Sequence, residues 1–126
     1  MNEARTRPLP NIRSLFIEGR LWHDRQNGNT YHAVSIEVNG KWLMNVGITY
    51  GYEDHYLQTA LEWLKKWQLV HEDTRHVYDL KNTMDVYTAR NYTLKRELFK
   101  DTMKGKKVED YYHQLVRIEA LKNGEF

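Results

Sequence analysis

One short stretch of the chain combines the side chains that can recognise a phosphorylated, aromatic molecule. Arg90, Asn91 and Tyr92 follow one another, and Lys95 and Arg96 come shortly after them. Guanidinium and ammonium groups neutralise phosphate, an aromatic ring stacks on a base, and an amide can read the edge of that base. A solvated helix face would carry the same charges, and charge alone favours it. These five residues are therefore candidate ligand-binding residues, with a solvated surface as the alternative.

Positive charge is concentrated in the same part of the sequence. The 126-residue chain has a formal net charge of only +2 at pH 7, but residues 81–107 contain eight basic and three acidic residues. This local excess is compatible with a surface that meets phosphate groups. Arg20, which alternation places on the same strand face as Trp22, either covers aromatic surface or contacts an anion. A net charge this small does not by itself indicate a nucleic-acid-binding protein.

The sequence contains no recognisable constellation of catalytic or metal-ligating residues. It has six histidines, but none is paired at i, i+4 spacing with an acidic third ligand, and there is no Cys to supply a thiolate. No nucleophile signature, glycine-rich phosphate loop or dinucleotide fingerprint occurs. We therefore expect a binding protein rather than an enzyme, with no metal, cofactor or catalytic residues.

The first half of the chain alternates apolar and polar residues, which is the period of half-buried strands. The Asn-Gly pairs at 27–28 and 39–40 tolerate positive φ and predict two hairpin connections. Residues 1–11 are expected to form an extended lead-in to an antiparallel meander over residues 13–50. The expected strands are Arg13–His23, Tyr31–Val38 and Lys41–Tyr50, the third with Trp42, Met44, Val46 and Ile48 on one face.

The period of the apolar residues changes near residue 55, where a strand gives way to a helix. From Tyr56 onward apolar residues recur at helical spacing, and a helix over residues 54–67 is expected to cover the apolar sheet face. Asp54 can accept from the free amides of its first turn. The tyrosines of the preceding loop would wrap the sheet edge. Alternatively, the free amides at the helix N-terminus could hold a phosphate. A capping Asp54 carboxylate would argue against this, because it would occupy those amides.

The pattern predicts that residues 70–122 are mainly helical. We expect a shorter helix over Val70–Asn82, a short strand or loop over Met84–Leu94, and helices over Thr93–Met103 and Val108–Lys122. The chain is therefore expected to be a single α+β domain over residues 1–126. Its N-terminal antiparallel β-meander packs against helices, and its C-terminal half is mainly helical.

The sequence lacks the features of membrane and secreted proteins. No run is long and apolar enough to span a membrane, and the N-terminus lacks the apolar core of a signal peptide. The absence of Cys fits a reducing compartment. We expect a protein of the cytoplasm.

Three segments of the N-terminal half resemble a known protein family. They are Ile17–Trp22, Asn27–Ala33 and Tyr50–Ala60. Together, over roughly residues 13 to 64, they resemble the first-described Thoeris anti-defence family of small phage proteins, which act as sponges for host immune signalling nucleotides. The family pattern prefers a glycine at the position of Glu53.

The resemblance implies a function as well as a fold. It implies an antiparallel sheet beside long helices, a homodimer or higher homo-oligomer, and capture of cyclic ADP-ribose isomers in the host cytoplasm without cleavage. Some members are similar in also taking cyclic dinucleotides or trinucleotides at separate sites. Neither a membrane nor a nucleic acid is an expected partner. The candidate ligand-binding residues, chosen by their chemistry, are Arg20, Arg90, Asn91, Tyr92, Lys95 and Arg96.

Two other functions stay open from the sequence. The chain would also suit a phage inhibitor that binds a host defence protein directly, as anti-CRISPR proteins do, because its many aromatic residues favour a protein interface. A nucleic-acid-binding module that uses residues 81–107 is the third hypothesis, and it predicts affinity that falls steeply with salt.

Overall fold

The first three strands form the antiparallel meander that the alternating sequence predicts. The computed structural model describes residues 9–92 and 108–126. The helix expected over Thr93–Met103 and residues 1–8 of the expected lead-in lie outside the described residues. The observed elements are β1 (Ser14–Asp24), β2 (Asn29–Val38), β3 (Lys41–Tyr50), α2 (His55–Lys66), η1 (Val77–Asn82), β4 (Asp85–Asn91) and α4 (Val108–Lys122).

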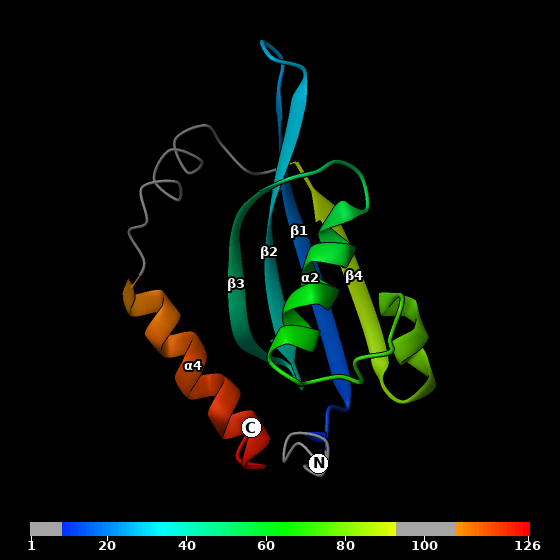
Figure 1. Cartoon of the computed structure of the whole chain (residues 1–126), viewed down its shortest axis with the longest axis vertical. Helices are drawn as coiled ribbons and strands as arrows, with labels where there is room; N and C mark the ends of the chain where they lie inside the picture. Colours follow the sequence, from blue (N-terminus) through cyan, green and yellow to red (C-terminus); the bar gives the residue numbers. More distant parts are fainter. Residues whose placement is uncertain (1–8, 93–107) are drawn as a thin grey trace.

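The four described strands form one mixed sheet in the order β3-β2-β1-β4 (Figure 1). β1 pairs with β2 and β2 with β3 in antiparallel register, whereas β4 lies parallel to β1. The tight β2–β3 turn places Asn39 and Gly40 at φ 54° and 80°, the left-handed conformations that such a hairpin needs. The α+β class and the N-terminal meander are therefore confirmed.

One face of the sheet is the core, and α2 covers it. Leu15, Ile17 and Leu21 of β1 are buried on this face, opposite Val38, Ile36 and His32 of β2. The buried residues of α2 are Tyr56, Leu57, Thr59, Ala60, Leu61 and Leu64. Burying one leucine or isoleucine side chain contributes roughly 1.5–3 kcal/mol. A shift of β1 by one residue would turn this apolar row to the other face, so the core fixes the register.

The predicted face of the third strand is wrong for Trp42. The ladder between β2 and β3 shifts by one residue, so that Met44 pairs with Ile36 but Trp42 pairs with Glu37. Leu43 and Met44 are consequently both buried, and Trp42 lies on the face away from α2. A β-bulge of this kind leaves no mark in a simple alternation pattern.

The prediction of a mainly helical C-terminal half is wrong. Between residues 70 and 92 the structure has a short 3-10 helix, η1, and a strand, β4. Tyr87 and the β-branched Val86 and Thr88 favour the strand, and pairing with β1 stabilises it. Of the strand or loop expected over Met84–Leu94, the structure has the strand, and the expected helix Val108–Lys122 is confirmed. None of the described helices is long and apolar enough to cross a membrane.

Helix α4 lies beside β3 and covers its outer edge (Figure 1). The Asn45 amide donates to Oε1 of Gln114 at 2.6 Å, and Nε of Arg117 donates to the Trp42 carbonyl. The Arg117 guanidinium also lies 5.5 Å from the Trp42 ring centre and 4.9 Å from that of Phe126. These contacts satisfy backbone groups that an open strand edge would leave unpaired.

Replacing Arg117 by alanine is expected to destabilise the protein by about 1–2 kcal/mol, because it removes a hydrogen bond and two cation–π contacts. Urea unfolding measures the change. Lys122→Ala removes the same charge from the same helix and should change stability by less than about 0.5 kcal/mol. Equal effects of the two substitutions would contradict a specific role for Arg117.

Candidate functional site

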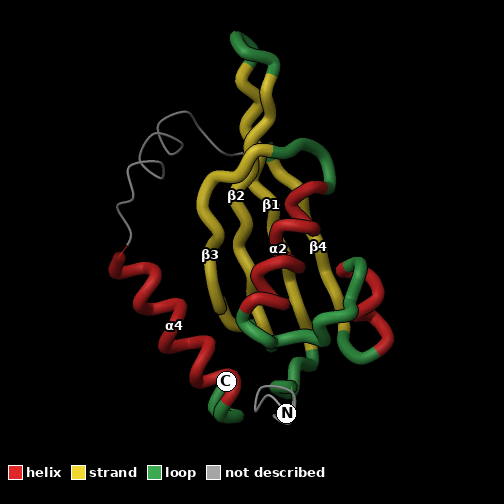
Figure 2. Tube along the Cα trace, viewed as in Figure 1, coloured by secondary structure: helices red, strands yellow, loops and turns green. Residues whose placement is uncertain are grey.

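Exposed tyrosines gather where β3 and β4 end. Tyr50 closes β3, Tyr52 lies in the loop that leads to α2, and Tyr92 directly follows β4. Their exposed fractions are 60%, 63% and 64%. Figure 2 shows this loop crossing the end of the sheet near the base of the projecting β1–β2 hairpin. We call this region the tyrosine end and define it by Arg20, Tyr50, Tyr52, Asn91 and Tyr92.

The structure brings together two of the residues that the sequence singles out. Arg20 of β1 and Asn91 of β4 are direct partners in the parallel ladder, so both lie on the sheet face away from α2. The Nε atom of Arg20 is buried and has no hydrogen-bond partner among the residues that the structure describes. Because buried polar atoms are nearly always paired, such an atom marks a place where an acceptor is missing.

An aromatic row continues from these residues across the sheet. The rings of Trp22 and Tyr31 are stacked with centres 5.9 Å apart, and Tyr50 meets Tyr31 edge to face at 5.8 Å. Both pairs lie on the same face as Arg20, because Trp22 pairs with Tyr31 and Tyr31 with Tyr50 in the ladders. The sequence alone does not predict this row, because the three rings come together only through the register of β1, β2 and β3.

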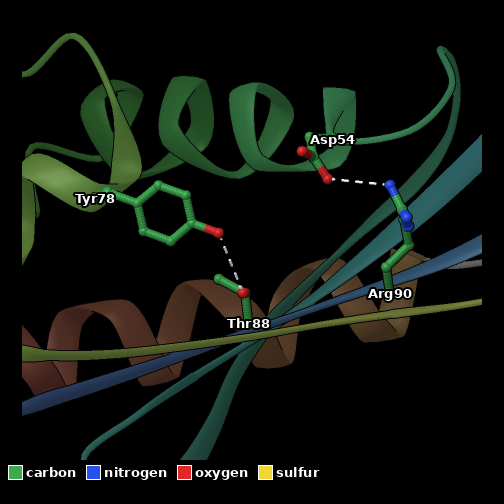
Figure 3. A network of polar contacts seen from close by, with 4 residues as sticks. All are labelled: Asp54, Tyr78, Thr88 and Arg90. Atoms are coloured by element: carbon green, nitrogen blue, oxygen red, sulfur yellow. Dashed lines mark hydrogen bonds and ion pairs between the residues drawn. The ribbon is translucent and has the colours of Figure 1, made fainter.

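Arg90 lies on the opposite face from Asn91. It pairs with Gly19 in the ladder, on the face that α2 covers. Its Nη1 atom is 3.2 Å from Oδ1 of Asp54 at the start of α2 (Figure 3). The exposed Tyr92 belongs to the tyrosine end, and the candidates Lys95 and Arg96 lie outside the described residues.

The predicted capping role of Asp54 is wrong. Asp54 occupies the N-cap position of α2 but makes no side-chain cap hydrogen bond. Its carboxylate contacts Arg90 instead. The Asp54 carboxylate therefore does not occupy the amides of the first turn of α2.

Hydroxyl groups lie beside this ion pair, between α2, η1 and β4. The Tyr78 hydroxyl is 3.5 Å from Oγ1 of Thr88 (Figure 3). Burial raises the pKa of Tyr56, a hydrogen bond with Thr88 opposes that rise, and the charge of Arg90 opposes it further. The phenol of Tyr56 is therefore neutral at physiological pH.

His32 fixes the loop that carries Tyr50 and Tyr52. Its Nδ1 is 3.0 Å from the Gly51 carbonyl, and its Nε2 is 2.8 Å from Oγ1 of Thr59. Since the carbonyl can only accept, Nδ1 donates to it, and the neutral ring accepts the Thr59 hydroxyl at Nε2. Burial lowers the pKa of His32, the Gly51 hydrogen bond opposes this, and nearby His55 lowers the pKa further.

A cleft of about 320 Å³ opens between the start of α2 and η1. Leu57, Leu61 and Val77 line it together with charged and polar side chains. Glu53 at its rim has φ 52°, a conformation that favours glycine. The other lining residues are Tyr52, Asp54, His55, Gln58, Arg75 and His76. Its mixed charges indicate no single ligand, and no sequence motif marks Arg75 as part of it.

Metal-ligating geometry is not found among the residues that the structure describes, because no three His, Asp or Glu side chains there are grouped to hold an ion. Comparisons of this chain with protein-family models, with curated proteins and with solved structures find no match.

Proposed function

We propose that this protein binds a cyclic signalling nucleotide of the cyclic ADP-ribose type and holds it without cleaving it. It would act as a phage anti-defence sponge in the host cytoplasm, and cyclic oligonucleotides are further candidate ligands. A sponge of this kind needs affinity and abundance rather than turnover. The resemblance of residues 13 to 64 to the Thoeris anti-defence family supports this proposal, as does the chemistry of the tyrosine end.

The observation that carries the proposal is the buried Nε of Arg20, which has no hydrogen-bond partner in the described part of the chain. A phosphate oxygen would complete its hydrogen bonding and neutralise its charge once the atoms that cover Nε move aside. Asn91 lies directly beside it in the ladder and supplies an amide donor and acceptor. The two together form a small polar site of the kind that can anchor a phosphorylated ligand.

Aromatic rings for a base lie at the same end of the sheet as this polar site. Tyr50, Tyr52 and Tyr92 are more than half exposed, although exposed aromatic surface costs free energy in water. Stacking one base on an aromatic side chain contributes roughly 1–3 kcal/mol. Exposed rings at the same end of the sheet as a guanidinium therefore suit a nucleotide better than they suit a simple anion.

The first experiment is a calorimetric titration of the purified protein with cyclic ADP-ribose isomers and with cyclic di- and trinucleotides. We expect tight binding to one of these classes and recovery of the intact ligand after heat denaturation. Recovery of a cleaved product would contradict a sponge and would indicate an enzyme.

Replacing Arg20 by glutamine should weaken this binding about tenfold or more, because charge-assisted hydrogen bonds contribute roughly 1.5–3 kcal/mol. Arg13→Gln is the matched control. Arg13 is exposed just before the other end of β1, and its loss changes the net charge equally. Equal affinities of the two variants would remove Arg20 from the site.

A protein inhibitor is the second candidate function, because exposed tyrosines are also common in protein interfaces. If the protein forms a homo-oligomer, as the resemblance implies, the same rings could meet a second subunit. Absence of binding across the whole nucleotide panel would favour the inhibitor, which predicts a defined complex with a host defence protein.

A further inference from the structure

The contact between Arg90 and Asp54 is looser than the chemistry of the two groups allows. A guanidinium can donate two parallel hydrogen bonds to one carboxylate. Here Nη1 of Arg90 meets only Oδ1 of Asp54, at 3.2 Å (Figure 3). The Arg90 side chain is 41% exposed and the Asp54 side chain is 75% exposed. Water screens such a pair, so its net contribution to stability is small.

Within residues 9–92 and 108–126, Asp54 has no second interaction that would hold its carboxylate in place. It stands at the N-cap position of α2 without a cap hydrogen bond, and its backbone has φ −90° and ψ 9° rather than the extended conformation of a typical N-cap. Arg90 is its hydrogen-bond and ion-pair partner within residues 9–92 and 108–126. The carboxylate can therefore leave Arg90 at little cost.

Arg90 lies on the rung next to Arg20 and Asn91, but on the other face of the sheet. The β1–β4 ladder holds it opposite Gly19 and holds its neighbour Asn91 opposite Arg20. The two arginines are thus on adjacent rungs of the ladder, one on each face of the sheet. Tyr92 follows at once in the chain. The Arg90 side chain is 41% exposed, so a phosphate group can reach its guanidinium from solvent on the face that α2 covers.

We infer that Asp54 is a built-in competitor, which occupies Arg90 in the free protein and is displaced by a phosphate group of the ligand. The inference rests on the proposed function in so far as the ligand is taken to bind at the tyrosine end. A phosphate offers three oxygens and more negative charge than a carboxylate, so it can engage both Nη atoms of Arg90. The displaced Asp54 then lies at the start of α2, where a carboxylate can cap the helix.

The test is a calorimetric titration of the protein with inorganic pyrophosphate at low ionic strength, with wild type and Asp54→Asn compared. Asparagine keeps the size of the side chain and is an equally good N-cap residue, but it does not compete for a guanidinium as an anion. We expect the variant to bind pyrophosphate about two- to fivefold more tightly, which corresponds to ~0.4–1 kcal/mol at 1.4 kcal/mol per tenfold change.

Two further variants make the result specific to this contact. Glu53→Gln removes a charge from the neighbouring, exposed residue, and it should leave the affinity for pyrophosphate nearly unchanged. The double variant Asp54→Asn, Arg90→Gln should lose the gain in affinity. The inference is overturned if wild type and Asp54→Asn bind equally, if neither binds, if Glu53→Gln binds as tightly as Asp54→Asn, or if the gain survives without Arg90.

The same variants separate this inference from the proposed function. If no cyclic nucleotide binds, but Asp54→Asn binds pyrophosphate more tightly than wild type does, the nucleotide sponge is wrong and the competition between Asp54 and anions stands. If a cyclic nucleotide binds wild type and Asp54→Asn with equal affinity, the sponge stands and the competition is wrong.

Discussion

Replacing Gly19 by alanine is expected to lower the free energy of unfolding by about 2–3 kcal/mol, because the added methyl group would overpack the core. A Cβ at this position would lie 2.5 Å from Cγ of Tyr56 and 2.6 Å from its Cδ2. These atoms belong to the inner part of a ring that is 3% exposed, so the ring cannot turn away as a flexible chain end would. Urea unfolding monitored by tryptophan fluorescence measures the loss.

A double-mutant cycle tests whether the Tyr56 ring is the cause. In a Tyr56→Ala background the same Gly19→Ala substitution should cost less than about 0.5 kcal/mol, since the ring that it would overlap is gone. An undiminished cost in the Tyr56→Ala background would contradict the proposed clash.

The parts of the fold that the sequence predicts are those with local signals. The three strands of the meander follow from strict alternation and two Asn-Gly turns, and helix α4 ends at Lys122 as expected because Gly124 adopts φ 77°. β4 has weak local signals, and its pairing with the distant β1 decides its conformation. The register shift beside Leu43 is also a tertiary effect, since it lets two consecutive residues reach the core.

In the candidate site too, some features have local sequence signals and others depend on tertiary contacts. The chemistry of Arg20 and Asn91 is visible in the sequence, but their pairing across β1 and β4 is visible only in the structure. Asp54 was expected to cap α2, because aspartate before a helix usually does so. Its contact with Arg90, which comes from a distant strand, replaces that local bond. A tertiary partner therefore decides the role of Asp54.

His32 is expected to make the stability of the protein depend on pH. The side chain is 1% exposed, and burial lowers its pKa below the usual 6.5, with His55 adding to the effect against the Gly51 hydrogen bond. The folded state therefore takes up a proton less readily than the unfolded state. Stability is fully present above about pH 6.5 and falls as the pH drops toward the lowered pKa, by up to about 1.4 kcal/mol per pH unit.

The comparison of wild type with His32→Gln isolates this contribution, because the other histidines are present in both proteins. At pH 7.5 we expect the variant to be less stable by about 2 kcal/mol, since Thr59 and the Gly51 carbonyl lose a well-placed partner. Between pH 6.5 and 5 the difference in stability between the two proteins should shrink. Only wild type has a buried imidazole that must stay neutral in the folded state, and this costs free energy as the pH falls. Urea unfolding at four pH values between 5 and 8 measures both curves, and His71→Gln, at an exposed histidine, should follow wild type. A constant difference between wild type and His32→Gln across this range would show that His32 does not titrate differently in the folded and unfolded states.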